Sequence, residues 1–147
     1  MERCDLALAV ISDLAGAVGE EYPLDRIRMQ KAVFLLVQRG SPDWRALYRY
    51  VPYDWGPYSS QLASDIRNME HDGLLEVERG AAGRYGAYRT TPRGALVAAQ
   101  IWERLSQPER EFIRLVRAYV THRSFTDLLR EVYAAYPEFA TASRFTG

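Results

Sequence analysis

The segment from Tyr53 to Leu75 constrains the fold of this chain more than any other part of the sequence. It begins with an aromatic turn on Gly56-Pro57, where proline fixes φ and glycine accepts conformations that other residues avoid. A serine follows, which can cap a helix by accepting a hydrogen bond from a free backbone amide. Gly73 then stands where a helix needs a left-handed stop, just before Leu74. The segment therefore predicts a turn, a helix and a strand, in that order.

The neighbouring segments extend this order into a larger unit. Residues 74–79 and 85–90 have strand character and are joined by Gly80-Ala81-Ala82-Gly83, which predicts a β-hairpin. Apolar periodicity predicts two earlier helices, at about residues 2–18 and 25–38, and start signals after residue 90 predict three more. We therefore expect an α+β, mostly helical fold in a single domain of residues 1–147. Its parts are a winged-helix-like core of three helices plus the hairpin wing (about 1–91) and a C-terminal helical extension (about 92–147).

Composition narrows the classes of function. The 147 residues include 19 basic and 19 acidic side chains, so the net charge is zero. A broad basic surface, as many nucleic-acid-binding proteins have, is therefore not expected. The single cysteine, Cys4, allows no internal disulfide, and the sequence has no apolar run of about 18 residues to span a membrane. Since the N-terminus also lacks a basic-then-apolar leader, we expect a cytoplasmic protein with no membrane partner.

Several short motifs carry a resemblance to a known family. Arg28-Met29-Gln30-Lys31 lies on the second predicted helix, and it is followed by the turn from Tyr53 to Ser59 and by Gly73-Leu74. Over about residues 25–143 the chain resembles the Panacea (SocA-like antitoxin) and YwgA-like proteins, in which a Leu-Gln-Lys helix precedes a Tyr-Gly-Pro-Tyr-Ser turn and a helix ending in Gly-Leu. The ending from Leu128 to Glu138 looks like the tail of the YwgA-like group.

This resemblance has specific implications and two departures. It implies a winged-helix-like fold and, for the Panacea branch, an antitoxin role in neutralising a partner protein. The YwgA-like branch implies no activity. Met29 stands where the family has leucine, which is a volume-conserving exchange. Asp54-Trp55 precedes the Gly-Pro pair, which leaves the turn itself unchanged.

No group of residues in the sequence indicates catalysis. His71 and His122 are far apart, and together with Cys4 they do not supply the ligand set of a structural zinc site. Cys4 has no base near it in the sequence to activate it as a nucleophile. The glycines of the predicted wing lead into a strand rather than into a helix, unlike a phosphate-binding loop. We therefore expect a protein that is not an enzyme and has no cofactor, metal or catalytic residue.

The helix predicted between Ser59 and Asp72 favours a protein partner over DNA. It carries three carboxylates against Arg67 alone, and negative charge opposes approach to phosphate. Tyrosine and tryptophan, which crowd the turn before it, are favoured anchors of protein interfaces. The candidate partner-binding residues are Tyr53, Trp55, Tyr58, Gln61, Asp65 and Asn68.

Two groups of arginines are candidates for binding nucleic acid or an acidic partner. One group surrounds the predicted wing, and the other recurs at i, i+4 and i+7 on the helix that begins near residue 107, away from its apolar face. Both patterns are also typical of a solvated surface. The residues are Arg79, Arg84 and Arg89 for the wing, and Arg110, Arg114 and Arg117 for the helical stripe. Lys31, on an otherwise apolar helix, should reach the surface or pair with Asp54 or Asp65.

Two functional hypotheses follow. The first is a non-enzymatic binding protein of the antitoxin-like class, which neutralises or regulates a protein partner in a toxin–antitoxin or defence-type system. The alternative is a DNA-binding transcriptional regulator that uses the wing arginines as a homodimer, because one small neutral domain offers few phosphate contacts.

Overall fold

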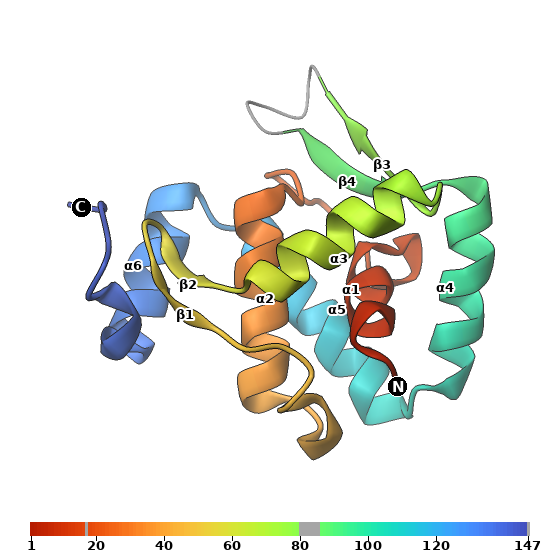
Figure 1. The fold of residues 1–147 in the computed structure, drawn as a ribbon, viewed down its shortest axis with the longest axis horizontal. Helices are drawn as coiled ribbons and strands as arrows, with labels where there is room; N and C mark the ends of the chain where they lie inside the picture. The colour runs from red at the N-terminus through yellow and green to blue at the C-terminus, as the bar shows by residue number, and fades with distance from the viewer. Residues whose placement is uncertain (17, 80–85, 147) are drawn as a thin grey trace.

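The structure is a computed structural model that describes residues 1–16, 18–79 and 86–146. Within these residues the chain forms six α-helices and two small antiparallel hairpins, which Figure 1 shows in their arrangement. The predicted α+β, mostly helical class is confirmed. The helices are α1 (Arg3–Ile11), α2 (Arg26–Arg39), α3 (Ser60–His71), α4 (Pro92–Arg104), α5 (Gln107–Thr121) and α6 (Phe125–Ala135). The strands are β1 (Val51–Tyr53), β2 (Gly56–Tyr58), β3 (Leu75–Glu78) and β4 (Ala87–Thr90), and the short 3₁₀ helices are η1 (Asp13–Ala15), η2 (Pro42–Trp44) and η3 (Pro137–Ala140).

The helices begin at the capping residues that the sequence indicates. The side chains of Asp25, Ser59, Thr91 and Ser124 each accept a hydrogen bond from a backbone amide in the first turn of the helix that follows. Ser106 forms a capping box at the start of α5. Because these bonds satisfy amides that have no partner inside the helix, they fix where each helix starts.

The first helix is shorter than the predicted range of about 2–18. α1 ends at Ile11, and Ser12 leaves the helical conformation before η1. The helix ends here because a residue far along the chain caps it. The Arg117 guanidinium donates hydrogen bonds to the carbonyls of Val10, Ile11 and Ser12 at 2.9–3.0 Å. A basic side chain at a helix C-terminus satisfies carbonyls that would otherwise lack donors.

Both hairpins are antiparallel, and only the second was predicted as such. In β1–β2, Tyr53 pairs with Gly56 and Val51 with Tyr58, so the Gly-Pro turn itself forms a strand. In β3–β4, Leu75 pairs with Thr90. The predicted tip of this hairpin, residues 80–83, lies outside the described residues. β4 makes a further backbone contact, since the Tyr88 amide donates to the Leu24 carbonyl at 2.9 Å just before α2.

One continuous hydrophobic core joins the two parts of the chain. α1 and α2 contribute Leu6, Met29 and Val33, and α5 contributes Ile113 and Val116 to the same buried cluster. Figure 1 shows the β1–β2 hairpin between α2 and α6, and α3 crossing α2 beneath the β3–β4 hairpin. No helix in the described part of the chain is both long and apolar enough to cross a membrane.

Candidate binding cleft

A cleft of about 600 Å³ lies where the β1–β2 turn, α2, α3 and the β3–β4 hairpin meet. This volume is typical of ligand-binding clefts in proteins. We refer to it as the cleft throughout. The residues that matter most for its chemistry are the aromatic side chains Tyr53, Trp55, Tyr58 and Tyr88, together with the cations Lys31, Arg67 and Arg79.

The aromatic wall comes from the β1–β2 turn. Tyr53 stacks on Tyr58 with 4.6 Å between ring centroids and an interplanar angle of 26°. Tyr53 is 51% exposed, so this stacked pair presents an apolar surface to solvent. Trp55 is held from behind, because its ring packs edge-on against Phe125 of α6 at 5.5 Å. The turn therefore offers preformed aromatic surface on a supported backbone.

The floor of the cleft explains why the Gln-Lys helix and the Gly-Pro turn belong together. The Gln30 side chain donates to the Ser59 carbonyl at 3.0 Å and accepts from the Ser59 amide at 2.8 Å, as a neighbouring strand would. Lys31 Nζ donates to the Pro57 carbonyl at 3.4 Å. Its partner is thus a backbone oxygen, and the predicted pairing of Lys31 with Asp54 or Asp65 is wrong. A side chain on Gly56, whose φ is +93°, would also press against Lys31 Cε.

The electrostatics of Lys31 follow from its burial. Only 3% of the residue is exposed. Burial lowers the pKa of its amine to about 7, although the Asp25 carboxylate acts in the opposite direction. A low-dielectric environment disfavours the charged form of an amine, which accounts for this direction. Lys31 therefore exchanges between charged and neutral forms close to neutral pH.

The β3–β4 hairpin presents two different faces. Val77 pairs with Tyr88 on the face that lines the cleft, and Arg79 follows directly after β3. On the other face, Arg89 lies 2.7 Å from Glu78 and 3.5 Å from Glu76, so its charge is already balanced. Arg84 lies outside the described residues. Of the wing arginines in the described part, Arg79 is thus the one that belongs to the cleft.

The residues predicted on α3 separate into three positions. Gln61 and Asn68 are exposed but do not line the cleft, and the Gln61 side chain accepts from the Arg49 amide at 3.0 Å. Asp65 was predicted as a partner-binding residue, but it is only 8% exposed. It faces inward, where it accepts two hydrogen bonds from Arg3 at 2.9 Å and one from the Tyr48 hydroxyl at 2.7 Å.

All three arginines of the predicted stripe on α5 donate hydrogen bonds to backbone carbonyls of the protein itself. Arg110 donates to the Trp102 carbonyl at 2.9 Å, and Arg114 donates to the Leu14 carbonyl at 3.0 Å while lying over the Trp102 ring. Arg117 is buried, and besides capping α1 it pairs with Glu20 at 2.9 Å. The outward orientation expected for all three is wrong for Arg117, whereas Arg114 is exposed and Arg110 is half-buried. The carbonyls that accept from Arg114 and Arg117 lie about a hundred residues away, and no local pattern reveals such partners, whereas Arg110 bonds to Trp102 on the preceding helix.

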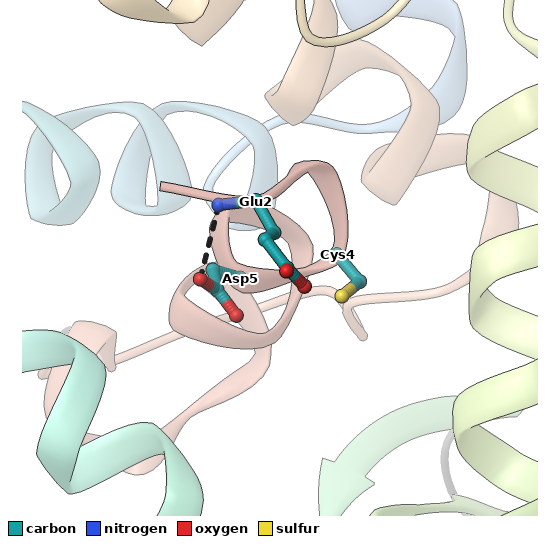
Figure 2. Close-up of side chains that lie close together, drawn as sticks. All are labelled: Glu2, Cys4 and Asp5. Atoms are coloured by element: carbon teal, nitrogen blue, oxygen red, sulfur yellow. Dashed lines mark hydrogen bonds between the residues drawn. The ribbon is translucent and has the colours of Figure 1, made fainter.

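Figure 2 shows a second group of side chains, Glu2, Cys4 and Asp5, at the start of α1. The Glu2 amide donates to Asp5 Oδ2 at 3.1 Å, which is a capping contact. Burial and the nearby carboxylates raise the pKa of the Cys4 thiol, so it is a poor source of the thiolate that binds metals. We interpret this group as the cap of α1.

Comparisons with known proteins yield no relative. No family model matches the chain, and neither a curated protein nor a solved structure matches it significantly. Any functional conclusion therefore depends on the residues and contacts described above.

Proposed function

We propose that this protein is a non-enzymatic binding protein of the antitoxin-like class, which engages a protein partner through the cleft. The observation that carries the proposal is the meeting, at one concave surface, of a supported aromatic turn with cations from α3 and the wing. Concave aromatic surfaces with a few charged groups are characteristic of binding sites.

The order of elements supports a winged-helix-like scaffold. Three helices, α1 to α3, precede the β3–β4 hairpin, and the Leu24 carbonyl bonds to β4 as a short additional strand would. In this interpretation the cleft lies between the second and third helices and the wing. Its aromatic turn is an insertion between those two helices.

Tyr53 and its neighbours favour a protein as the partner. Tyrosine and tryptophan are enriched at protein interfaces because they supply large contact areas with little loss of side-chain entropy. Tyr53 is half exposed although it is a large aromatic residue, and it lies on the rim of the cleft. Part of its ring surface is therefore available to a partner.

The DNA-binding alternative has less support from the described residues. The exposed charges at the end of α3 are Arg67 against Glu70 and Asp72, which leaves that helix slightly acidic even with Asp65 turned inward. Arg89 is already paired with two glutamates. Arg79 remains as a described wing cation that can approach phosphate, and it is shared with the cleft.

Affinity capture with a variant pair tests the proposal. Tagged wild type, Tyr53→Ala and Leu115→Ala are incubated with a nuclease-treated extract of the native host, and bound proteins are quantified by mass spectrometry. Leu115 is a matched control, since it is 63% exposed and lies on α5 away from the cleft. We expect one protein to be retained by wild type and Leu115→Ala and to be lost with Tyr53→Ala.

A second step tests the antitoxin-like role. The retained partner is expressed alone and together with wild type or Tyr53→Ala, and cell growth is followed. Growth inhibition that wild type relieves and Tyr53→Ala does not relieve is the expected result. Retention of DNA in the untreated extract, with no Tyr53-dependent protein after nuclease, would support the alternative instead.

A further inference from the structure

The cleft concentrates positive charge in a molecule whose net charge is zero. Four cationic side chains line it against two carboxylates. One of these carboxylates, Asp54, is already approached by Arg144 at 3.5 Å, which further weakens its effect on the cleft. The lining cations are Arg26, Lys31, Arg67 and Arg79, and the lining carboxylates are Asp54 and Glu70.

Two of these arginines form no hydrogen bond or ion pair with another described residue. Arg67 and Arg79 are exposed, and in the described part of the chain neither forms a hydrogen bond or an ion pair. Arg89 differs from them, because it forms ion pairs with two glutamates on the opposite face of the hairpin. A guanidinium group presents donors in a fork that matches a carboxylate, so both arginines suit an anionic partner group.

Lys31 adds an amine beneath this surface that a bound anion would hold in its charged form. Its amine has one described acceptor, the Pro57 carbonyl, for three donors, and it lines the cleft although it is 97% buried. In a poorly solvated position an amine responds strongly to a new negative charge nearby. Asp25 acts on its charge, and Tyr133 of α6 lies beside it at Gly56. The other ionisable side chains that line the same cleft are Arg26, Tyr53, Asp54, Tyr58, Arg67, Glu70, Arg79 and Tyr88.

We infer that the occupant of the cleft is an acidic segment of the partner protein, with carboxylates on Arg67 and Arg79 and apolar side chains against the Tyr53–Tyr58 pair. The inference rests on the proposed function, because it assigns the chemistry of the partner to the same cleft. Charge complementarity argues for it directly. A nucleic acid is also anionic, but α3 ends with Arg67 against Glu70 and Asp72, which opposes a continuous phosphate backbone, and a peptide segment can also place apolar side chains against the Tyr53–Tyr58 pair.

Peptide binding tests this inference without the natural partner. The probes are a short fluorescent peptide that alternates glutamate with leucine and phenylalanine, and the same peptide with glutamine in place of every glutamate. We expect the glutamate peptide to bind at least about tenfold more tightly, and its binding to weaken with salt. Equal binding of the two peptides, or no binding of either, would overturn the inference.

Matched charge reversals locate the binding. Arg67→Glu/Arg79→Glu should weaken the glutamate peptide by about tenfold or more, since attraction is replaced by repulsion at two positions. Arg45→Glu/Arg104→Glu changes the net charge equally at two exposed arginines outside the cleft and should have little effect. If both double variants lose affinity for the glutamate peptide equally, the peptide is attracted to the molecule as a whole. If a short duplex DNA binds more tightly than the peptide and this binding is lost in the Arg67→Glu/Arg79→Glu variant, the cations bind phosphate. Either result contradicts the inference.

Lys31 provides an independent readout because it is the only lysine in the chain. Lysine-selective ¹³C labelling therefore gives a single side-chain signal whose titration can be followed by NMR. The glutamate peptide should raise the pKa of this amine above its value of about 7, and the glutamine peptide should not. An unchanged titration at saturating glutamate peptide would show that the carboxylates do not enter the cleft.

These experiments separate the two proposals. If the captured partner depends on Tyr53 but not on Arg67 and Arg79, the proposed function stands and the acidic occupant is wrong. If the glutamate peptide binds as expected but no host protein depends on Tyr53, the chemistry of the cleft is supported and the proposed function fails.

Discussion

At the scale of single residues, Lys31 places an amine where a positive charge is unfavourable. The folded protein lowers the pKa of this group to about 7, whereas the unfolded chain keeps it near 10.5. Between these values the unfolded state binds more protons than the folded state, so stability rises with pH. The penalty is complete below about pH 7 and disappears as the pH approaches 10.5.

We expect Lys31→Met to stabilise the protein, most strongly at pH 7 and below. Methionine fills a similar volume without a charge, and replacing a buried charge in this way yields up to about 1–4 kcal/mol. Urea unfolding of both proteins between about pH 6 and 9, below the range of tyrosine titration, measures the difference. A gain that does not shrink as the pH rises would show that the Lys31 amine is solvated normally.

Asp65 on α3 is expected to contribute to the stability of the fold and not to binding in the cleft. Its carboxylate holds Arg3 and the Tyr48 hydroxyl, so Asp65→Asn should lower the free energy of unfolding by about 1–2 kcal/mol. Asn68→Ala, at an exposed position on the same helix, should change it by less than about 0.5 kcal/mol. Chemical denaturation measures both. Because Asp65 does not line the cleft, the folded Asp65→Asn variant should bind the glutamate peptide like wild type.

At the scale of elements, local chemistry made most helix boundaries predictable. Capping side chains such as Ser59 and Thr91 act on amides within three residues, so their effect can be recognised in the sequence. The end of α1 was not predictable, because its carbonyls are capped by Arg117 from another helix. The strand at Gly56–Tyr58 was missed for a similar reason, since Gln30 and Lys31 hold that turn from α2.

The candidate site likewise combines features that local sequence makes predictable with features that depend on contacts between distant elements. The aromatic side of the cleft was predictable, because Tyr53, Trp55 and Tyr58 crowd a recognisable turn. The cations were only partly predictable. Arg79 was expected from its place beside the wing, but the meeting of Arg67 and Lys31 with it depends on how α3 crosses α2.

Gly94 sets how closely α4 approaches the start of the β3–β4 hairpin. A Cβ atom at this position would overlap the backbone carbonyl of Leu74, which directly precedes β3. Alanine is favoured over glycine inside a helix by about 1 kcal/mol, but the overlap with a fixed backbone group outweighs this preference. Gly94→Ala should therefore destabilise the protein by about 2–3 kcal/mol. Thermal unfolding measures the change.

The neighbouring position provides the control for this effect. Ala95 is exposed, so Ala95→Gly removes a methyl group without relieving or creating a contact and should cost at most about 1 kcal/mol. If Gly94→Ala were neutral or stabilising, α4 would have room to move away from Leu74, and the packing of α4 against the wing would not fix its position.

At the scale of the whole molecule, the C-terminal segment completes the core and supports the cleft. Leu128, Leu129 and Val132 of α6 are buried, and Phe34 of α2 packs edge-on against Tyr136 and Phe139. Further along, the backbone amide of residue 144 donates to the carbonyl of residue 54 in the aromatic turn at 2.9 Å. The segment that the sequence predicts as a helical extension is thus packed into the same structure as the first 91 residues.

We therefore expect a chain that ends at Arg123 to lose cooperative folding. The shortened chain loses the burial of Leu128, Leu129 and Val132, which contributes about 1.5–3 kcal/mol of folding free energy for each side chain. Together these losses approach the total stability of about 5–15 kcal/mol that is typical of a domain. Thermal unfolding followed by circular dichroism measures the transition, with a chain lacking only residues 146–147 as the control. That control keeps every described contact of α6 and η3 and should melt like the full chain. A sharp transition at an unchanged temperature in the shorter chain would mean that the first 123 residues fold alone, and the aromatic turn would then keep its shape without α6.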